Sequence, residues 1–549
     1  MSGKRYRSNW PYAAYIFTLL CLMGIGCGEK PDATSAAEDS ANVINVGNRS
    51  EVQDLDPHLV TGIAEHRVLC ALFQGLANLD ATTLQPIPGA AVSWEVSPDD
   101  VAYTFKLRPE GRWSNGDPVT AHDFVYAWQR MLSPALGSEY AYLLHALKNG
   151  KAFNEGTLTD FSQVGAKAPD DLTLEVTLEN PIPYFLSMQI HYAWFPVHRP
   201  TIEKFGQMTD RGTPWTRPGN HVGNGPFKLL DWKPDQVLKT VRSETYWDNA
   251  NTKLDGVNFF PISNEQTEER SFRSGELDMT YSIPMHRIPV YQQESPELLV
   301  IAPYLQSYFY RFNLTRPPFN DARVRLAFSM AIDREEITRN ILKGGEQPAY
   351  FLTPPGTAGY TSTYKVSHDQ ERARALLAEA GFPNGQGLPA IELLYNSADF
   401  DRTVAQAVQR MWKEVLGADV QLLNQDYKVY LSSMSNLDFA ICRSTWLGDV
   451  LDPINFLECF LTGGGNNRTG YASPEFDALI QQAYAEADPE TRRGYLQQAE
   501  ARLLEDAPIA PVFFQTQKFL KSPRLQGLQP NLVGYIPWED LYLSGDAAP

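Results

Sequence analysis

The sequence predicts an α/β protein. Short apolar segments of strand length alternate with amphipathic segments of helix length along most of the chain. Residues that favour turns, chiefly Gly, Pro, Asn and Ser, separate these segments. The 549 residues allow several domains at roughly 150 residues each, and they contain no internal repeat.

The first clear elements are a strand over 102–107 (AYTFKL), a turn over 108–111 (RPEG) and a helix that begins after Thr120. Thr120 and Asp123 have the spacing of a capping box. The Thr side chain can accept a hydrogen bond from a free N–H, and Asp123 faces the positive end of the helix. The other predicted elements are helices over 321–343, 371–380, 403–416, 474–485 and 489–504, and strands over 391–395, 420–423, 439–442 and 510–514.

Residues 1–27 predict a lipoprotein signal peptide. Three basic residues among the first seven precede an apolar run over 12–26, which is typical of a secretory signal. The run ends in Gly24-Ile25-Gly26-Cys27, which resembles a bacterial lipobox in which Cys27 receives the lipid. An ordinary cleaved signal with an incidental Cys27 is the alternative. Residues 28–42 are polar and predict a flexible tether.

Charge and cysteine content narrow the functional class. The net charge of −18 and the lack of a basic cluster in the body of the chain argue against nucleic-acid binding. Of five cysteines, Cys21 and Cys27 belong to the signal region, so Cys70, Cys442 and Cys459 remain in the body. A Cys442–Cys459 bridge is one alternative that the spacing does not decide.

The sequence contains no pattern typical of a metal site or an enzyme. Cysteines and histidines do not occur at zinc-binding spacings, so we expect no metal and no cofactor. The chain has no G-x-S-x-G motif and no local Cys/His signature of a protease. The glycine-rich segment 463–470 (GGGNNRTG) lacks the G-K-[ST] ending of a phosphate loop. We therefore expect a binding protein, with a secreted hydrolase as the less favoured alternative.

Seven sequence blocks occur in a fixed order over most of the chain. They are EVQDLDPH (51–58), WSNGDPVTAHDFVYAWQR (113–130), NGPF (224–227), RSGELD (273–278), PFNDARVR (318–325), RSTWLGD (443–449) and YASPEFD (471–477). Together they resemble the periplasmic oligopeptide-binding proteins of ABC importers. The likeness extends from about residue 43 to the C-terminus.

The resemblance implies a three-lobed, type II periplasmic-binding-protein-like fold, with two hinged lobes around a central cavity and an extra lobe. A ligand that touches both hinged lobes favours their closed state. Two chain crossings near residues 305 and 516 would form the hinge. The expected boundaries are 43–75, 200–305 and 517–549 for lobe I, 76–199 for lobe II and 306–516 for lobe III.

The resemblance also implies an extracytoplasmic, monomeric substrate-binding component of an ABC peptide importer. It would capture short peptides, deliver them to permease subunits, and be held at a bacterial membrane by its lipid. Because fold does not determine ligand, the alternative is a receptor on the same scaffold for a muropeptide, haem or a metal chelate.

A receptor for many peptides must bind what all peptides share: the backbone, the α-ammonium and the α-carboxylate. Strand addition can pair with the backbone, and a fixed carboxylate can neutralise a desolvated ammonium. The resemblance implies Asp449, three residues after Trp446, as this carboxylate. Without the resemblance, an Asp before Pro453 would be interpreted as a loop cap.

Further ligand contacts follow from the same resemblance. Trp446 would line the pocket near the first peptide residue, Tyr427 would lie against a ligand side chain, and Tyr140 would bond to ligand backbone. Each is otherwise interpreted as a packed or surface aromatic. The segment Thr61-Gly62-Ile63 would lie along the ligand backbone, with Thr61 in place of an acidic residue of close relatives.

Recognition of the ligand carboxylate is where this sequence departs from the family. Relatives use an Arg, a His and a Lys at different depths. Arg443 retains the Arg, whereas Asp401 stands at the His position and Leu342 at the Lys position. Gln306 and Leu447 stand where close relatives have a cysteine pair. The preferred peptide length therefore does not follow from the resemblance.

Overall fold

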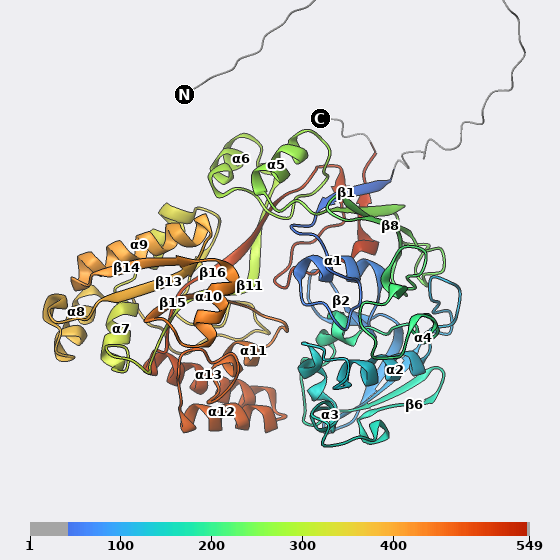
Figure 1. Ribbon diagram of the computed structural model, residues 1–549, viewed down its shortest axis with the longest axis horizontal. Helices are drawn as coiled ribbons and strands as arrows, with labels where there is room; N and C mark the ends of the chain where they lie inside the picture. Colours follow the sequence, from blue (N-terminus) through green and yellow to red (C-terminus); the bar gives the residue numbers. More distant parts are fainter. Residues whose placement is uncertain (1–41, 546–549) are drawn as a thin grey trace, which may run out of the picture. The chain divides into compact units, whose positions relative to one another are not determined.

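The computed structural model describes residues 42–545. The predicted signal peptide, Cys27 and all but the last residue of the predicted tether lie outside the described residues. The described part is a mixture of helices and sheets, which confirms the predicted α/β class (Figure 1). Its α-helices are α1 (Ile63–Leu72), α2 (Ala121–Leu132), α3 (Gly150–Asn154), α4 (Arg199–Phe205), α5 (Glu265–Arg273), α6 (Ile288–Glu294), α7 (Ala322–Met330), α8 (Gln370–Glu379), α9 (Asp399–Leu416), α10 (Tyr427–Ser435), α11 (Ile454–Leu457), α12 (Pro474–Ala485) and α13 (Pro489–Asp506).

Two four-stranded sheets form from the first half of the chain. The first has the order β1-β10-β9-β8, with β1 parallel to β10, so the start of the described chain pairs with a segment about 200 residues later. The second is antiparallel, with the order β4-β5-β7-β6. Their strands are β1 (Val43–Gly47), β4 (Ala91–Val96), β5 (Ala102–Leu107), β6 (Ala166–Asp170), β7 (Thr173–Thr177), β8 (Phe227–Lys233), β9 (Val237–Arg242) and β10 (Gly256–Phe260). Two small two-stranded sheets pair β2 (Ala77–Leu79) with β3 (Pro86–Pro88) and β17 (Leu525–Gln526) with β18 (Tyr542–Leu543).

One apolar core joins these two sheets. Ile44 of β1, Phe105 of β5, Trp128 of α2 and Trp538 near the C-terminus are all buried in the same cluster. Burial of large apolar side chains contributes roughly 1.5–3 kcal/mol each, so this continuous core holds both sheets as one unit.

A buried ion pair connects two of the seven sequence blocks. The Arg130 guanidinium donates to both carboxylate oxygens of Asp56, at 2.8 and 2.6 Å, and lies 3.0 Å from Nδ1 of His58. Burial alone would raise the pKa of Asp56, but Arg130 outweighs it and lowers the pKa. The residues of these blocks therefore stabilise the fold at this point.

The third large sheet has six strands in the order β12-β16-β11-β15-β13-β14. Alternate side chains of β11 enter two different cores: Tyr308 and Tyr310 pack with helices α7 and α9, whereas Leu305 and Phe309 pack with α11, α12 and α13. Helices therefore cover both faces of this sheet (Figure 1). Its strands are β11 (Leu299–Phe312), β12 (Gln347–Pro348), β13 (Ile391–Asn396), β14 (Val420–Gln425), β15 (Ile441–Leu447) and β16 (Ile509–Leu520).

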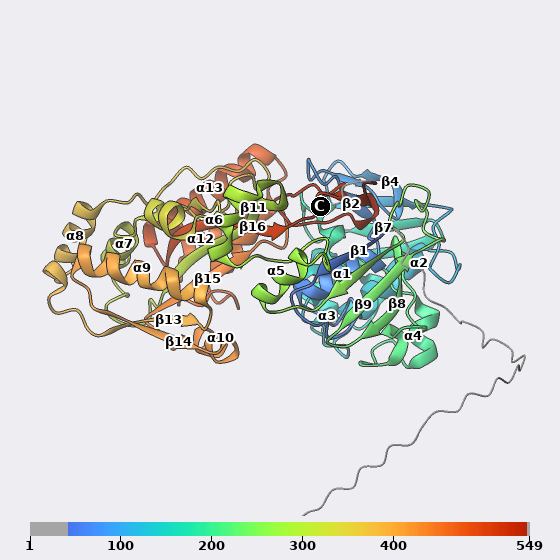
Figure 2. The ribbon, with the colours of Figure 1, turned by 90° about the horizontal axis from the view of Figure 1, so that it is seen from above.

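The strands β11 and β16 extend beyond this sheet as a long antiparallel pair. Pairing runs from Leu299 opposite Leu520 to Arg311 opposite Ile509, and its register shifts between Pro303 and Ser307. On the far side of the shift, Leu520 joins a small separate core with side chains of α5 and α6. Figure 2 shows the two strands passing from the helices of the large sheet toward α5. The predicted crossings near 305 and 516 fall on this pair, and the division into lobes stays a prediction.

Several predicted elements are confirmed and others have different bounds: the strand predicted over 439–442 is β15, which begins at Ile441 and ends at Leu447. The strand over 102–107 and the helix over 474–485 have the predicted bounds. The helix predicted over 321–343 is instead α7 followed by a separate π-helical segment, Glu336–Leu342. Between them, Oδ1 of Asp333 accepts a hydrogen bond from the backbone N–H of Glu336 at 2.9 Å, and buried Arg334 donates to the carbonyls of Ala349 and Pro511 at 2.7 and 2.8 Å. The strand predicted over 510–514 continues to residue 520.

Cys70, Cys442 and Cys459 are free in the structure, so the Cys442–Cys459 bridge is not formed. Among residues 42–545, no helix combines the length and apolar character that a membrane crossing requires.

Candidate functional site

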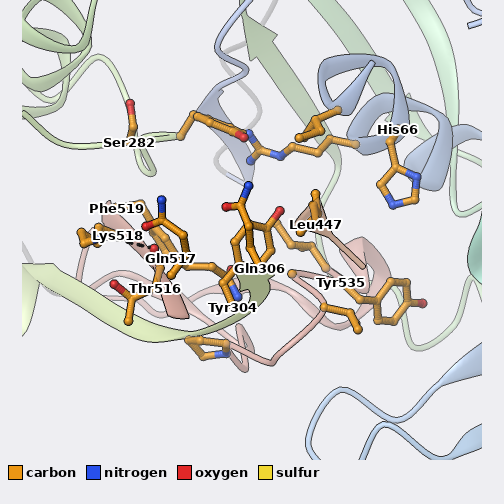
Figure 3. Close-up of a pocket in the computed structure, with 18 of the residues that line it drawn as sticks. His66, Ser282, Tyr304, Gln306, Leu447, Thr516, Gln517, Lys518, Phe519 and Tyr535 are labelled. Carbon is orange, nitrogen blue, oxygen red and sulfur yellow. Dashed lines mark hydrogen bonds between the residues drawn. The ribbon is translucent and has the colours of Figure 1, made fainter. Parts of the chain in front are cut away.

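A cavity of about 1030 Å³ lies among segments that are far apart in the sequence. Figure 3 shows His66 of α1 across this cavity from Tyr304 and Gln306 of β11 and Thr516 of β16. A volume of this order suits a ligand the size of a small organic molecule or short peptide. The segments that contribute to its wall are 61–67, 187–192, 263–266, 279–288, 304–306, 447–451, 515–519 and 528–536, with single residues such as Tyr140, Leu342 and Phe400 between them.

Asp449 lies on the cavity wall directly after β15. Its backbone N–H donates to Oδ1 of Asn455 at 2.9 Å, and the preceding Gly448 N–H donates to the Leu305 carbonyl at 2.8 Å. These two bonds fix the turn that carries the side chain. Within the described residues the Asp449 carboxylate has neither an ion-pair partner nor a hydrogen-bond donor.

The surroundings of Asp449 favour the arrival of a cation. Burial raises the pKa of Asp449 to about 6, and the nearby Glu458 carboxylate adds to this rise. Glu458 is half-buried, and its desolvation raises its pKa, although Tyr484 donates to it at 2.5 Å and Asn455 at 3.3 Å. A partly desolvated carboxylate beside a second acid is stabilised by an incoming positive charge.

Tyr140 also lies on the wall, within a cluster of aromatic rings. Its ring centroid is 4.8 Å from that of His191 and 5.7 Å from that of Tyr192, and the Tyr192 ring in turn lies 5.5 Å from His66. Burial raises the pKa of Tyr140 to about 12, and the charge of Asp449 contributes. Tyr140 is therefore a neutral phenol that can donate a hydrogen bond close to Asp449.

The segment Thr61-Gly62-Ile63 enters the cavity wall at the start of α1. A Cβ on Gly62 would lie 1.9 Å from Oε2 of Glu65, whose Oε1 is held by the backbone N–H of Gln53 at 2.8 Å. A side chain at Gly62 would displace that contact. No partner for the backbone N–H or C=O of Thr61 occurs within residues 42–545, so both can pair with a ligand.

Three predicted contact residues do not line the cavity. Tyr427 is 57% exposed at the start of α10, and its ring stacks on Tyr430 at 6.1 Å. Trp446 packs against the core of α11 to α13 and donates to Asn455 Oδ1 at 3.3 Å. Nε of Arg443 forms an ion pair with Oδ1 of Asp401 at 2.8 Å. The role of these residues as ligand contacts stays a prediction.

Two basic side chains line the cavity that sequence analysis did not single out. Arg67 is four residues after Ile63 on α1, so both lie on one helix face, and this spacing was a usable signal. Lys518 is on the part of β16 beyond the predicted strand, and it pairs with Glu346 at 2.6 Å. The described residues contain no group of three or more His, Cys, Asp or Glu arranged to hold a metal ion.

Comparison with known proteins gives the family. A model of bacterial extracellular solute-binding proteins, family 5 (middle), matches residues 85–468. The chain is 37% identical to the periplasmic oligopeptide-binding protein OppA of Salmonella typhimurium, over 97% of this chain and 96% of that protein. It is also 37% identical to the dipeptide-binding protein DppE of Bacillus subtilis, over 98% and 99% respectively.

A solved structure supports the same assignment. The murein tripeptide binding protein MppA of Escherichia coli superposes with a TM-score of 0.79 and 34% identity, covering 91% of this chain and 98% of that one. The predicted periplasmic-binding-protein-like fold is therefore confirmed. The family model, the relatives of nearly equal length and this fold agree, and the chain belongs to the bacterial extracellular solute-binding proteins of family 5.

Proposed function

We propose that the protein captures short peptides outside the cytoplasm and delivers them to the permease of an ABC importer. The observation that carries this proposal is the Asp449 carboxylate, which faces a cavity of about 1030 Å³ and has no partner among the described residues. The names of OppA and DppE, which describe peptide-binding proteins, support it.

Asp449 would bind the α-ammonium of the peptide. A desolvated ammonium needs a fixed anion, and a carboxylate whose pKa is raised to about 6 gains from the pairing. Tyr140, beside Asp449, would bond to the first peptide unit. This arrangement uses groups that every peptide with a free amino end possesses.

The peptide backbone would form strand-like hydrogen bonds at two places, the second half of β15 and the backbone at Thr61. Residues 443–447 of β15 pair with β11 on one side, whereas β13 reaches only Ile441 and Cys442 on the other. The second half of β15 therefore has an edge that no described strand occupies. Together with the free backbone groups of Thr61, this edge supports recognition that does not depend on side chains.

The remaining features of the proposal concern the ends of the chain and its lobes. Cys27 would carry a lipid that holds the protein at the outer face of a bacterial membrane, and residues 28–42 would act as a tether. Lobe III would close on the cavity about the β11–β16 pair, where the register shift supplies a point of bending. The protein would act as a monomer and release its ligand chemically intact.

A murein peptide is the second candidate ligand. The observation in its favour is the likeness to MppA, which is described as a murein tripeptide binding protein. Such a ligand is still a peptide, so the choice between the two concerns the ligand side chains and its ends.

The test compares free and N-acetylated trialanine by calorimetry. Wild-type protein should bind the acetylated peptide at least about 30-fold more weakly, because acetylation removes the charge that Asp449 pairs with. Asp449→Asn should lose the preference without lowering the melting temperature of the ligand-free protein.

Asp399→Asn is the matched control for Asp449→Asn. Asp399 also lines the cavity, but its side chain is 93% exposed and pairs with Arg402 at 3.3 Å, so the variant should keep the preference. Equal binding of both peptides by wild-type protein would show that the ammonium site is wrong.

A further inference from the structure

The Asp449 carboxylate on the cavity wall can bind a positively charged group of the ligand. The structure also contains a basic side chain that can bind a negatively charged group. The inference that follows rests on the proposed function and concerns the other end of the ligand. Among the residues that line the cavity, the Lys and Arg side chains are Arg67 and Lys518. Arg67 and Lys518 differ in whether an acidic side chain already pairs with them, and Arg67 differs from Arg443 in the same way.

Arg443 is already neutralised. Its Nε is 2.8 Å from Oδ1 of Asp401, and the two side chains are only 14% and 4% exposed. Burial alone would lower the pKa of Arg443, but Asp401 outweighs it and raises the pKa. Arg443 is also absent from the cavity wall, so its guanidinium, whose charge Asp401 already balances, is not placed to receive a ligand carboxylate there.

Lys518, like Arg443, already has an acidic partner. Its Nζ lies 2.6 Å from Oε1 of Glu346, with side-chain exposures of 15% and 1%. Nζ also donates to the Thr516 carbonyl at 3.2 Å. These contacts supply the lysine with an anion and an additional acceptor.

Arg67 differs from both. It is 9% exposed, and one of its five donors, Nη1–H, bonds to the Gly47 carbonyl at 2.7 Å. The guanidinium lies over the rings of Tyr281 and Trp538, 5.4 and 5.7 Å from their centroids. Within residues 42–545 no carboxylate comes close enough to form an ion pair with Arg67.

Glu268 is the carboxylate that most affects the charge of Arg67, and it already accepts hydrogen bonds from two backbone N–H groups. Glu268 accepts from the backbone N–H of Tyr281 at 2.6 Å and from that of Ser282 at 3.2 Å. Arg49 lies over the same Tyr281 ring at 5.6 Å, so a second cation adds to the positive potential here. Arg67 is thus a buried cation on the cavity wall that has hydrogen-bonding capacity left over.

We propose that Arg67 binds the ligand's anionic group, and that peptides with a free C-terminal carboxylate are selected through Arg67 rather than through Arg443. The aromatic faces of Tyr281 and Trp538 hold the guanidinium in place, and Gly47 fixes one of its nitrogens. Asp449 and Arg67 then form a pair of opposite charges for the two ends of a zwitterionic peptide.

The experiment measures how much affinity each variant loses when the peptide's carboxylate is replaced by an amide. Alanine peptides of two to five residues, as free acids and as C-terminal amides, are titrated by calorimetry, and the length that binds most tightly as the free acid is used. In wild-type protein the amide should bind about 10- to 100-fold more weakly, as expected for loss of a charged hydrogen bond. Arg67→Gln should reduce this ratio to near one, and Arg443→Gln should leave it unchanged.

The outcomes separate this inference from the proposed function. A ratio that survives in Arg67→Gln would make Arg67 a purely structural cation, and a ratio lost in Arg443→Gln would assign the carboxylate to Arg443. A wild-type ratio near one, with tight binding of both peptides, would overturn the inference and leave peptide binding intact. If no alanine peptide binds wild-type protein, the proposed function fails as well.

Folding is checked in the same series. Thermal unfolding of each variant shows whether Arg67→Gln retains the native structure. If it does not, Arg67→Lys is measured instead: it keeps the charge but loses the planar fork, so the ratio should fall while staying above one, and an unchanged ratio would overturn the proposal.

Discussion

Two charged groups on and beside β15 have opposite environments. Arg443, early in the strand, is paired with Asp401, and the pair is buried away from the cavity wall. Asp449, just after the strand, lies on that wall and has no partner among the described residues. Both belong to the block RSTWLGD, so the same short motif contributes a closed ion pair and an open carboxylate.

The comparison shows that an unsatisfied charge indicates a binding function better than a charged residue alone does. A buried charge that already has an opposite charge beside it has less to gain from a charged ligand, because its neighbour already balances it. A half-buried carboxylate beside Glu458 is in the reverse situation, since a cationic ligand removes a repulsion that is already present. The difference lies in the neighbours of each group.

The largest expected effect is on stability. Asp401→Ala leaves the Arg443 guanidinium buried without its anion, which we expect to lower the free energy of unfolding by about 3 kcal/mol. Asp449→Ala removes no partner and relieves a carboxylate whose pKa is raised to about 6, so at pH 7 it should raise the free energy of unfolding rather than lower it. Urea unfolding of the ligand-free proteins, followed by circular dichroism, measures both. Equal destabilisation by the two variants would contradict the contrast between the closed pair and the open carboxylate.

The second prediction concerns pH and uses the raised pKa of Asp449, about 6 compared with 3.8 for the unperturbed group. Peptide affinity should fall about tenfold between pH 7 and pH 5, because most of the carboxyl is then protonated and cannot pair with the ammonium. The ligand-free protein should show the opposite trend. Its carboxyl takes up a proton more readily when folded, so this group's destabilising contribution, present above pH 6, is lost as the pH falls toward 3.8.

Asp449→Asn is the control for the pH dependence of peptide affinity and for the pH dependence of stability. It should remove this part of the pH dependence of affinity and of stability. A wild-type affinity that stays constant from pH 7 to pH 5 would show that Asp449 does not titrate near 6 or does not bind the ammonium.

How much the sequence could predict depends on whether a feature is local. The strand over 102–107 was predicted with its bounds because apolar and polar residues alternate along it. The helix over 474–485 was predicted with its bounds because a Ser-Pro pair marks its start. The segment after α7 begins with a local cap by Asp333, but buried Arg334 beside it bonds to the carbonyl of Pro511, which is 177 residues away. No local pattern could reveal that contact.

The same limit applies to the site. The motif RSTWLGD identified Asp449, and the structure places that residue on the cavity wall. The motif also identified Arg443, but the pairing with Asp401 depends on how α9 packs against β15, which the motif does not contain. Arg67 belongs to no recognised block, and its burial depends on Tyr281 and on Trp538, which is 471 residues away.

The smallest expected effect distinguishes tyrosines on and off the cavity wall. Tyr140→Phe should weaken binding of a free peptide by about 2- to 10-fold, the range for one neutral hydrogen bond, because its phenol lies near Asp449 on the wall. Tyr427→Phe should leave the affinity within about twofold, since Tyr427 is exposed on α10 and outside the wall. Calorimetry under identical conditions measures both. A loss confined to Tyr427→Phe would mean that a ligand paired with β15 also reaches the side chains of α10, and that Tyr427 belongs to the binding site.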